Sequence, residues 1–311
     1  MRAALLPAGP DPYLLAYWLR HYRAWAPEVD ELHVAVCGQD DPAIRAYLAS
    51  LAGPNVTMTF GPPTDHGTTI AHLLRGVDGL VLLCEDDAFV RDPVRVRESF
   101  ERIERGETDV VGSPRSTGTP DILEHANARF GQLIATTGEA GPILWPCFLF
   151  ARSADLARTD GNYSVWGCPP GTTVLGRTFE REQVMDTFGW ASLQLRENGA
   201  RVHVEPNHRA NLATMAEWTD APWFHVGGLS TGFGMYILGP KAHDLTGLRG
   251  TDLTDWTKRA AFWSILADSG DGPDWLRDDY RASIATLVER MGMSPDEIGR
   301  WRASFDPLIN W

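Results

Sequence analysis

Several features that would assign the chain to a large class of proteins are missing from its sequence. No apolar run approaches the roughly 20 residues that a membrane-spanning helix needs, so we expect no membrane span. Residues 1–23 carry one early arginine and an apolar patch that Pro7, Pro10 and Asp11 interrupt, which is typical of a strand and a turn rather than a secretory signal. The cysteines are scattered without a Cys-x-x-Cys pair, which indicates reduced thiols, a cytoplasmic location and no structural zinc site.

Positive charge is also scarce. The chain has 28 Lys and Arg residues against 41 Asp and Glu residues, which gives a formal net charge of −13. An acidic surface repels a phosphate backbone, so we expect no nucleic-acid partner. One small phosphate ligand, held in a local site together with a metal ion, stays compatible with this charge. The 311 residues, 43% of them hydrophobic, are enough to bury a substantial core in one large domain or two ordinary ones.

The first hundred residues alternate short apolar strands with helices. Strands are predicted at residues 3–6, 32–37, 56–60 and 79–84, and helices at residues 12–25, 42–51 and from about residue 68. Continuous apolar strands that alternate with helices predict an α/β fold with a parallel sheet covered on both faces. A ligand of such a sheet binds beyond the carboxyl ends of the strands. The segments to inspect are therefore residues 7–11, 38–41, 61–69 and 85–87.

The pattern loosens in the second half of the chain. We predict strands at residues 109–113, 145–151 and 201–205, and helices at about residues 122–137 and 180–198. A stretch rich in glycine, proline and aromatic residues over 163–176 is typical of a loop over a site. After about residue 252 the chain is helical and rich in tryptophan, and we expect these helices to pack back on the rest of the chain or to form a homodimer. The predicted organisation is one catalytic domain, residues 1–245, with a helical C-terminal extension, residues 246–311.

Acidic residues follow directly on the apolar strand that ends at residue 84. Alternate side chains of an extended chain share a face, so Glu85 and Asp87 point one way and Asp86 the other. Two carboxylates on one side repel each other unless a cation lies between them. Oxygen donors suit Mg²⁺ or Mn²⁺, which in turn bridge the phosphates of a nucleotide. The alternative interpretation is a solvated acidic turn.

A turn that contains glycine leads into a helix shortly before this strand. It has the sequence Thr-Asp-His-Gly-Thr-Thr at residues 64–69. The backbone N–H groups and the positive dipole end of such a helix start can hold an anion. This segment is therefore a second candidate for binding phosphate.

With these segments in this order, the chain resembles the GT-A glycosyltransferases, especially their family-2-like group. The resemblance covers roughly residues 1–235 and is carried by His66-Gly67-Thr68 and the acidic strand end, where Glu85 replaces the first acid of an Asp-x-Asp-like motif. It implies a GT-A, Rossmann-like fold with a mixed, mainly parallel sheet flanked by helices. It also implies a nucleoside-diphosphate-sugar donor, a Mn²⁺ or Mg²⁺ ion, and transfer of a hexosyl group to a hydroxyl of a small-molecule or protein acceptor.

The resemblance also implies roles for single residues. Asp87 is the expected direct metal ligand, and Glu85 and Asp86 would serve the waters of the metal or the ribose of the donor. The first strand and turn would hold the base, and an acid after the second strand reads it in the family; here residues 36–39 intervene before Asp40. The expected donor-binding residues are Pro7, Gly9, Asp11, Asp40, His66, Gly67, Thr68, Glu85 and Asp86.

A histidine late in the domain completes the metal site in many GT-A enzymes. His225, which follows apolar residues and precedes glycines, matches that place. Imidazole is a common ligand for ions like Mn²⁺. The expected metal ligands are therefore Asp87, Glu85 and His225, and the alternative for the histidine is a hydrogen-bonded residue of the core.

Transfer to a hydroxyl is helped by a carboxylate that removes the proton. The resemblance suggests an acidic residue at the start of a helix that ends in glycine and a strand, here Gly199 and the residues after it. Asp186 fits best because the apolar helical stripe begins after it, and Glu182 is the other candidate. Asp186 as the general base implies inversion at the anomeric carbon; the alternative is a plain helix cap.

Two other functions stay open from the sequence. A sugar-phosphate nucleotidyltransferase uses a similar domain with carboxylates and Mg²⁺, but usually has a cationic first loop, which residues 6–11 lack. A catalytically inactive nucleotide-sugar-binding protein would bind a nucleoside diphosphate with metal and transfer nothing.

Overall fold

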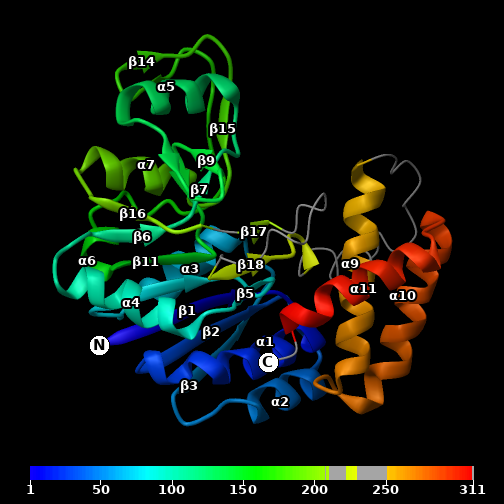
Figure 1. Ribbon diagram of the computed structural model, residues 1–311. Helices are drawn as coiled ribbons and strands as arrows, with labels where there is room; N and C mark the ends of the chain where they lie inside the picture. The colour runs from blue at the N-terminus through cyan, green and yellow to red at the C-terminus, as the bar shows by residue number, and fades with distance from the viewer. Residues whose placement is uncertain (207, 210–221, 230–250, 310–311) are drawn as a thin grey trace.

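The computed structural model describes residues 1–206, 208–209, 222–229 and 251–309, whose arrangement Figure 1 shows. The predicted boundary between residues 245 and 246 lies outside these residues. Among the residues described, no helix has both the length and the apolar character needed to cross a membrane.

A seven-stranded sheet forms the centre of the molecule, in the order β16-β6-β11-β4-β1-β2-β3. Pairing is parallel between β1 and β2, β1 and β4, β2 and β3, and β6 and β16, whereas β11 runs antiparallel to β4 and β6. The sheet is therefore mixed and mainly parallel, as predicted. Its strands are β1 (Arg2–Ala8), β2 (Glu31–Cys37), β3 (Val56–Gly61), β4 (Leu80–Cys84), β6 (Val110–Gly112), β11 (Phe148–Arg152) and β16 (Val202–Val204).

Helices cover both faces of this sheet, which confirms the α/β prediction. Successive residues of β4 point to opposite faces of the sheet and pack in two different hydrophobic cores. Leu82 belongs to one core and Leu83 to the other, and both side chains are fully buried. The core of Leu82 contains α1 (Pro12–Trp25), α2 (Pro42–Ser50) and α4 (Pro93–Glu104). The core of Leu83 contains α3 (His66–Leu74), α6 (Ser153–Leu156) and α7 (Gly189–Glu197). Because both faces are covered, a ligand reaches this sheet at the carboxyl ends of its strands.

Apart from β11 and α6, the chain between β6 and β16 builds a lobe, which Figure 1 shows above the sheet. Its core lies between α5 (Pro120–Phe130), α7 and the antiparallel pair β12 (Trp166–Cys168) and β15 (Gln183–Met185). The smaller elements of this region are β7 (Pro114–Arg115), β8 (Leu133–Ile134), β9 (Ala140–Gly141), β10 (Ile143–Leu144), β13 (Thr173–Val174) and β14 (Arg177–Thr178).

Several predictions for the lobe were wrong. The helix predicted over 180–198 begins only at Gly189, because residues 183–185 pair with β12 as a strand. The helix predicted over 122–137 ends at Phe130, since Gly131 has a φ of 77° and ends the helix there. The stretch 163–176 is not a loop over a site: it contains β12 and β13, and its Cys168 packs in the core of the lobe.

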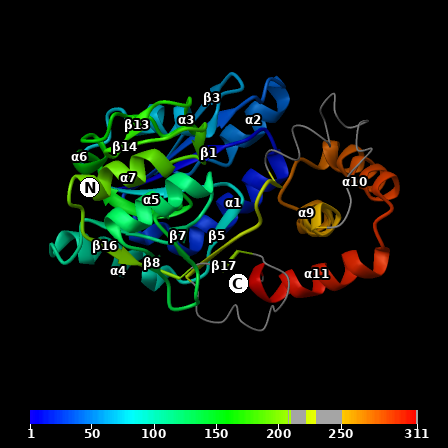
Figure 2. The ribbon, with the colours of Figure 1, turned by 90° about the horizontal axis from the view of Figure 1, so that it is seen from above.

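The C-terminal helices pack against α1 on one side of the molecule, as Figures 1 and 2 show. Residues of α9 such as Phe262 and Trp263 belong to the same core as α1, which confirms that the extension packs back on the rest of the chain. The homodimer through these helices stays a prediction. The elements are α9 (Thr251–Ser269), α10 (Arg277–Met291) and α11 (Pro295–Ile309), with the short 3₁₀ helices η1 (Ala26–Glu28) after α1 and η4 (Asp274–Leu276) before α10.

A second, three-stranded sheet in the order β17-β18-β5 adjoins the end of β4. Its strands are β5 (Ala88–Val90), β17 (His208–Arg209) and β18 (Trp223–His225). In the antiparallel pairing of β18 with β5, His225 lies opposite Ala88. This register brings a residue from late in the chain beside the acidic segment.

Candidate active site

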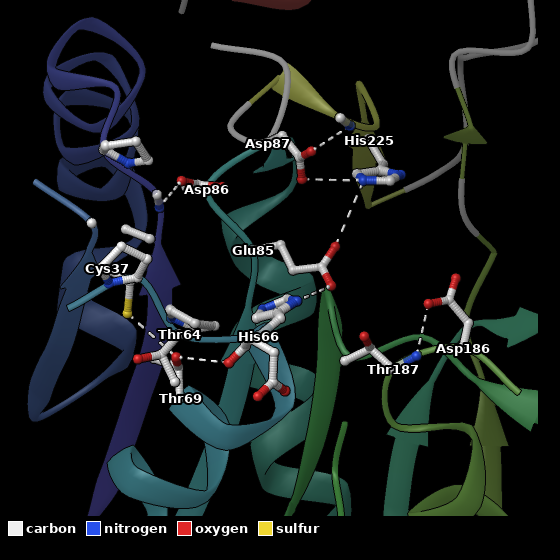
Figure 3. Close-up of a pocket in the computed structure, with 18 of the residues that line it drawn as sticks. Cys37, Thr64, His66, Thr69, Glu85, Asp86, Asp87, Asp186, Thr187 and His225 are labelled. Atoms are coloured by element: carbon white, nitrogen blue, oxygen red, sulfur yellow. Dashed lines mark hydrogen bonds and ion pairs between the residues drawn. The ribbon is translucent and has the colours of Figure 1, made fainter. Parts of the chain in front are cut away.

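A cavity of about 680 Å³ opens where β1, β2, β3 and β4 end. One wall consists of residues at and just after the ends of these strands, as expected for a parallel sheet. The other wall comes from the lobe and from the end of β18, and Figure 3 shows its Asp186 and Thr187 on the far side from Cys37. The strand-end wall contains residues 7–10, 37–38, 63–66, 69 and 85–87, and the other wall contains Arg115, Trp145, Asp186, Thr187, His225 and Gly228.

The acidic segment after β4 lies in this cavity, with its side chains on alternate faces as predicted. Glu85 and Asp87 both face His225, whose Nε2 lies 3.6 Å from Glu85 Oε2 and 3.1 Å from Asp87 Oδ1 (Figure 3). Asp86 turns the other way, and its Oδ2 accepts the Gly9 N–H at 2.7 Å. All three carboxylates are buried. The structure therefore brings the three predicted metal ligands together.

Charges within this group stabilise one another. Burial alone would raise the pKa of Asp87, but the charge and hydrogen bond of His225, with the Gly228 N–H at 2.9 Å from Asp87 Oδ2, hold this pKa below its usual value. Burial alone would lower the pKa of His225, but Asp87 and Glu85 raise it. The aspartate and the histidine are thus an ion pair.

Two more side chains contact Glu85. The Cys147 thiol donates a hydrogen bond to Glu85 Oε2 at 2.6 Å, and His66 Nδ1 lies 3.2 Å from Glu85 Oε1. Burial and the neighbouring Glu85 raise the pKa of the Cys147 thiol. The sequence analysis missed Cys147, because only the pairing of β11 with β4, with Phe148 opposite Cys84, places it beside the acidic segment.

The donor set fits a divalent cation. Carboxylate oxygens and an imidazole nitrogen are ligands that Mn²⁺ accepts, and Mg²⁺ accepts the oxygens. Ligand atoms of Glu85, Cys147 and His225 all lie within 4.8 Å of one another. His225 carries at most one positive charge against two buried carboxylates, and buried carboxylates are costly without a compensating cation. Glu85, Asp87 and His225 are therefore the residues that could hold a metal.

The expected donor-binding residues divide into two groups. Of the expected set, Pro7, Gly9, His66, Glu85 and Asp86 line the cavity. The others, Asp11, Asp40, Gly67 and Thr68, do not belong to its lining. Thr64, Asp65, Thr69 and Gly38, which lie in the segments that the sequence marked for inspection, line it as well, and so does Cys37, which no prediction named.

Each residue outside the lining has a partner elsewhere. Asp11 caps α1 and accepts the Tyr280 hydroxyl at 3.0 Å, and burial raises the pKa of this carboxyl to about 7. Asp40 is exposed and pairs with Arg45 at 2.9 Å. Gly67 lies against the 163–164 backbone, where a Cβ would come within 2.0 Å of Ser164 N.

The start of α3 is occupied by a side chain of its own. Asp65 is the N-cap, and its Oδ1 accepts the Thr68 N–H at 3.0 Å. Burial alone would raise the pKa of Asp65, but hydrogen bonds from Ser164 and Thr68 lower it. In this arrangement the cap carboxylate holds the position at which the sequence analysis expected an anion.

Asp186 lies in the wall contributed by the lobe. Its Oδ2 is bound by the guanidinium of Arg115, and its Oδ1 accepts the Thr187 N–H at 2.8 Å. Arg115 is 9% exposed and lies over the ring of Trp145, 3.7 Å from the ring centre. Glu182, the other candidate base, is exposed and outside the lining. The sequence analysis missed Arg115 and Trp145, since nothing in their local sequence distinguishes them.

No protein-family model matches the chain, and no curated protein matches it. Solved structures do. A mannosyltransferase from Pyrobaculum calidifontis, solved with GDP-Man and Mn²⁺, is 13% identical to this chain, with a TM-score of 0.43. The match covers 98% of this chain and 74% of the mannosyltransferase. S. aureus TarS 1-349 is 11% identical with a TM-score of 0.43, covering 98% and 91%. Glucosyl-3-phosphoglycerate synthase from Mycobacterium tuberculosis is 21% identical with a TM-score of 0.38, covering 51% and 59%.

At these identities and TM-scores, neither the activities nor the ligands of these proteins transfer to this chain. The fold is instead identified by the structure itself. The sheet order, the antiparallel β11 beside β4, and the cavity at the end of β4 agree with the fold that the sequence resemblance implies. The chain therefore has the mixed, mainly parallel α/β fold that the resemblance to the GT-A group implies.

Proposed function

We propose that the protein is a metal-dependent glycosyltransferase that moves a hexosyl group from a nucleoside-diphosphate sugar to an acceptor hydroxyl. One observation carries the proposal: Glu85, Asp87 and His225 converge in a strand-end cavity whose other wall presents a further carboxylate, Asp186. Glu85 and Asp87 share the single imidazole of His225, and a bound divalent cation would balance their remaining negative charge. Metal binding and proton removal need carboxylates in different surroundings. Glu85 and Asp87 beside His225 suit the first task, and Asp186 in the lobe suits the second.

The cavity has room for such a donor. Its volume, about 680 Å³, lies within the roughly 300–1,000 Å³ of small-molecule sites. Residues 7–10 and 37–38 lie at and just after the ends of β1 and β2, and we assign the nucleoside to them. Gly38, with a φ of 77°, gives this wall a backbone conformation that a larger residue rarely adopts. Asp86 holds the Gly9 N–H and thereby fixes the turn after β1.

Asp87, Glu85 and His225 would hold the Mn²⁺ or Mg²⁺ ion, and His66 would orient Glu85 through its Nδ1. When bound, the ion offsets the negative charge that develops on the departing diphosphate. The Gly228 N–H keeps Asp87 Oδ2 in place, which leaves Oδ1 on the side of His225.

Asp186 would accept the proton of the acceptor hydroxyl. Arg115 and the Thr187 N–H each bind one of its oxygens. A carboxylate has about four lone-pair sites, so both oxygens keep acceptor capacity for a hydroxyl. Stacking on Trp145 fixes the Arg115 guanidinium, and the guanidinium fixes the carboxylate. Attack by a hydroxyl whose proton passes to Asp186, with displacement of the diphosphate in the same step, would give inversion at the anomeric carbon.

The test is release of nucleoside diphosphate from a panel of nucleoside-diphosphate sugars with Mn²⁺ or Mg²⁺, with and without candidate acceptors. Release that requires the metal and is lost in Asp87→Asn supports the proposal. Release of pyrophosphate from a nucleoside triphosphate and a sugar phosphate would instead show a nucleotidyltransferase. Thermal stabilisation by a nucleoside diphosphate with metal, without any release, would show an inactive binding protein; a ligand at a hundred times its Kd adds about 2.7 kcal/mol.

A further inference from the structure

We propose that Cys147 is a ligand of the bound metal ion and that its thiolate makes the site prefer thiophilic divalent ions over Mg²⁺. This inference rests on the proposed function in one respect, namely that a divalent ion binds beside Glu85 and Asp87. It goes further by assigning a sulfur ligand and an order of metal preference to the site.

Strand pairing places the thiol at the metal-binding carboxylates. Cys147 directly precedes β11, and Phe148 pairs with Cys84, the residue before Glu85. The Cys147 side chain is buried, 4% exposed, and its Sγ lies 2.6 Å from Glu85 Oε2. It therefore reaches the carboxylate that also faces His225.

The other cysteines have different surroundings. Cys84 packs in the core that contains α1, and Cys168 packs in the core of the lobe. Cys37 lines the cavity but lies 3.3 Å from the Thr69 hydroxyl and is not part of the group of possible metal ligands. Cys147 is thus the cysteine whose sulfur adjoins both a carboxylate and an imidazole, and Cys37 is its natural control.

The donor atoms are spaced as they would be around one ion. Ligand atoms of Glu85, Cys147 and His225 all lie within 4.8 Å of one another, and the His225 Nε2 lies 3.6 Å from Glu85 Oε2. Asp87 Oδ1 lies 3.1 Å from the same imidazole nitrogen. Ligands about 2.0–2.3 Å from a tetrahedral ion lie about 3.3–3.8 Å from one another. Small side-chain movements would therefore suffice to bring the donor atoms of Glu85, Cys147 and His225 onto one ion.

The chemistry of the donor set decides the preference. Sites made of oxygen and water suit Mg²⁺, whereas thiolate and imidazole favour Co²⁺, Zn²⁺ and Cd²⁺. The thiol proton leaves to solvent when the sulfur coordinates. If Cys147 served only to pack the core and to donate to Glu85, a serine would preserve that hydrogen bond and leave the metal preference unchanged.

The test compares wild type, Cys147→Ser and Cys37→Ser in the full chain, each checked for folding by circular dichroism. Co²⁺ is titrated and the thiolate-to-cobalt charge-transfer absorbance is measured in the near ultraviolet. We expect the band in wild type and Cys37→Ser and its loss in Cys147→Ser. In competition against Mn²⁺, Cd²⁺ should lose at least about tenfold of its relative affinity in Cys147→Ser. If the serine variant misfolds, Cys147→Ala is measured in its place.

The outcomes separate this inference from the proposed function. Co²⁺ binding without a sulfur band in wild type, or an unchanged ratio of Cd²⁺ to Mn²⁺ affinity in the serine variant, overturns the sulfur ligand and leaves the glycosyltransferase proposal standing. If neither Mn²⁺ nor Co²⁺ binds, even with uridine or guanosine diphosphate present, the metal site fails and both proposals fail with it.

Discussion

The ends of β4 and β1 each carry a buried aspartate, yet the two aspartates have opposite electrostatic surroundings. At the end of β4, Asp87 faces His225, and this pair holds its pKa below the usual value although burial alone would raise it. At the end of β1, Asp11 accepts neutral donors, the N–H groups of its own helix and the Tyr280 hydroxyl, and burial raises its pKa to about 7. Burial of an aspartate at a strand end therefore does not by itself indicate a ligand site. The side chain that pairs with the aspartate decides whether it is held charged, as Asp87 is, or favours the protonated acid, as Asp11 does.

The two partners also come from different parts of the fold. His225 lies on β18, and its partner Asp87 still lines the cavity. Tyr280 lies on α10, and its hydrogen bond places Asp11 in the contact between α1 and the C-terminal helices. The Tyr13 hydroxyl donates to Pro273 O at 2.7 Å in the same joint. One strand end became a candidate catalytic centre and the other a structural contact.

The largest effect is expected at the end of β4. Asp87→Asn should lower kcat/KM about 10³-fold or more and weaken metal-dependent donor binding, because the amide is a poorer ligand and no longer pairs with His225. The measurement is nucleoside diphosphate release together with calorimetric binding of the donor. Asp92→Asn is the matched control, since Asp92 caps α4 shortly after the same segment and has no place in the cavity lining. Equal activity in the two variants would refute the role of Asp87.

The carboxylate of the opposite wall should separate turnover from binding. Asp186→Asn should reduce kcat about 10²- to 10⁴-fold and leave donor affinity nearly unchanged, because the amide keeps the shape and loses the base. Glu182→Gln is the control, as Glu182 is exposed and lies outside the cavity lining. A wild-type kcat in Asp186→Asn would contradict the assignment of the base.

The end of β1 should control stability rather than chemistry. Because the folded-state pKa of Asp11 lies above its ordinary value of 3.8, folding favours the protonated acid, and this contribution is complete below about pH 4 and is lost as pH rises to about 7. The rise of this pKa from 3.8 to about 7 corresponds to about 4 kcal/mol in the free energy of unfolding. Denaturant unfolding from pH 4 to pH 8 measures this loss.

In Asp11→Asn that pH-dependent loss should disappear, because the amide does not titrate. Asp41→Asn is the control, since Asp41 caps α2 in the same way but is exposed. A slope of unfolding free energy against pH that is equal in wild type, Asp11→Asn and Asp41→Asn would show that Asp11 is not the titrating group.

The smallest expected effect concerns the support of Asp87 by the C-terminal helices. Arg259, on α9, donates from Nε to Gly227 O at 2.8 Å, next to the Gly228 N–H that binds Asp87. Arg259→Ala should weaken Mn²⁺ binding about 10- to 100-fold, as loss of an outer support of a metal site does. Arg281→Ala is the control, because Arg281 pairs with Asp268 at the surface of the same helical extension. Equal Mn²⁺ affinity in both variants would confine the helices to a packing role.

The features that the sequence predicted correctly are those set by neighbouring residues in the chain. Continuous apolar strands predicted the sheet, and the aspartates at residues 11 and 41 predicted the starts of α1 and α2. The alternation of Glu85, Asp86 and Asp87 also appears in the structure, since an extended backbone imposes it. Such features depend on neighbours within a few residues, which is why they can be read from the chain.

The same reasoning failed where residues far apart in the chain meet. It overextended the helix before Gly199, because the pairing of β15 with β12 overrides the local helical pattern. It placed Asp11 with the donor site, whereas Tyr280 and α1 enclose it. It did not find Arg115, whose role depends on contact with Trp145 and Asp186.

By itself, then, the sequence determined the α/β class, the order of the first strands and the acidic character of the end of β4, because periodicity and chain order are local properties. The tertiary structure alone decided that Glu85 and Asp87 face His225, that a thiol lies beside Glu85, and that Arg115 binds Asp186. The physical reason is that pairing of distant strands, not the spacing of residues, sets those distances. Ion pairs between side chains distant in the sequence form only when folding brings the charges within a few ångströms of one another.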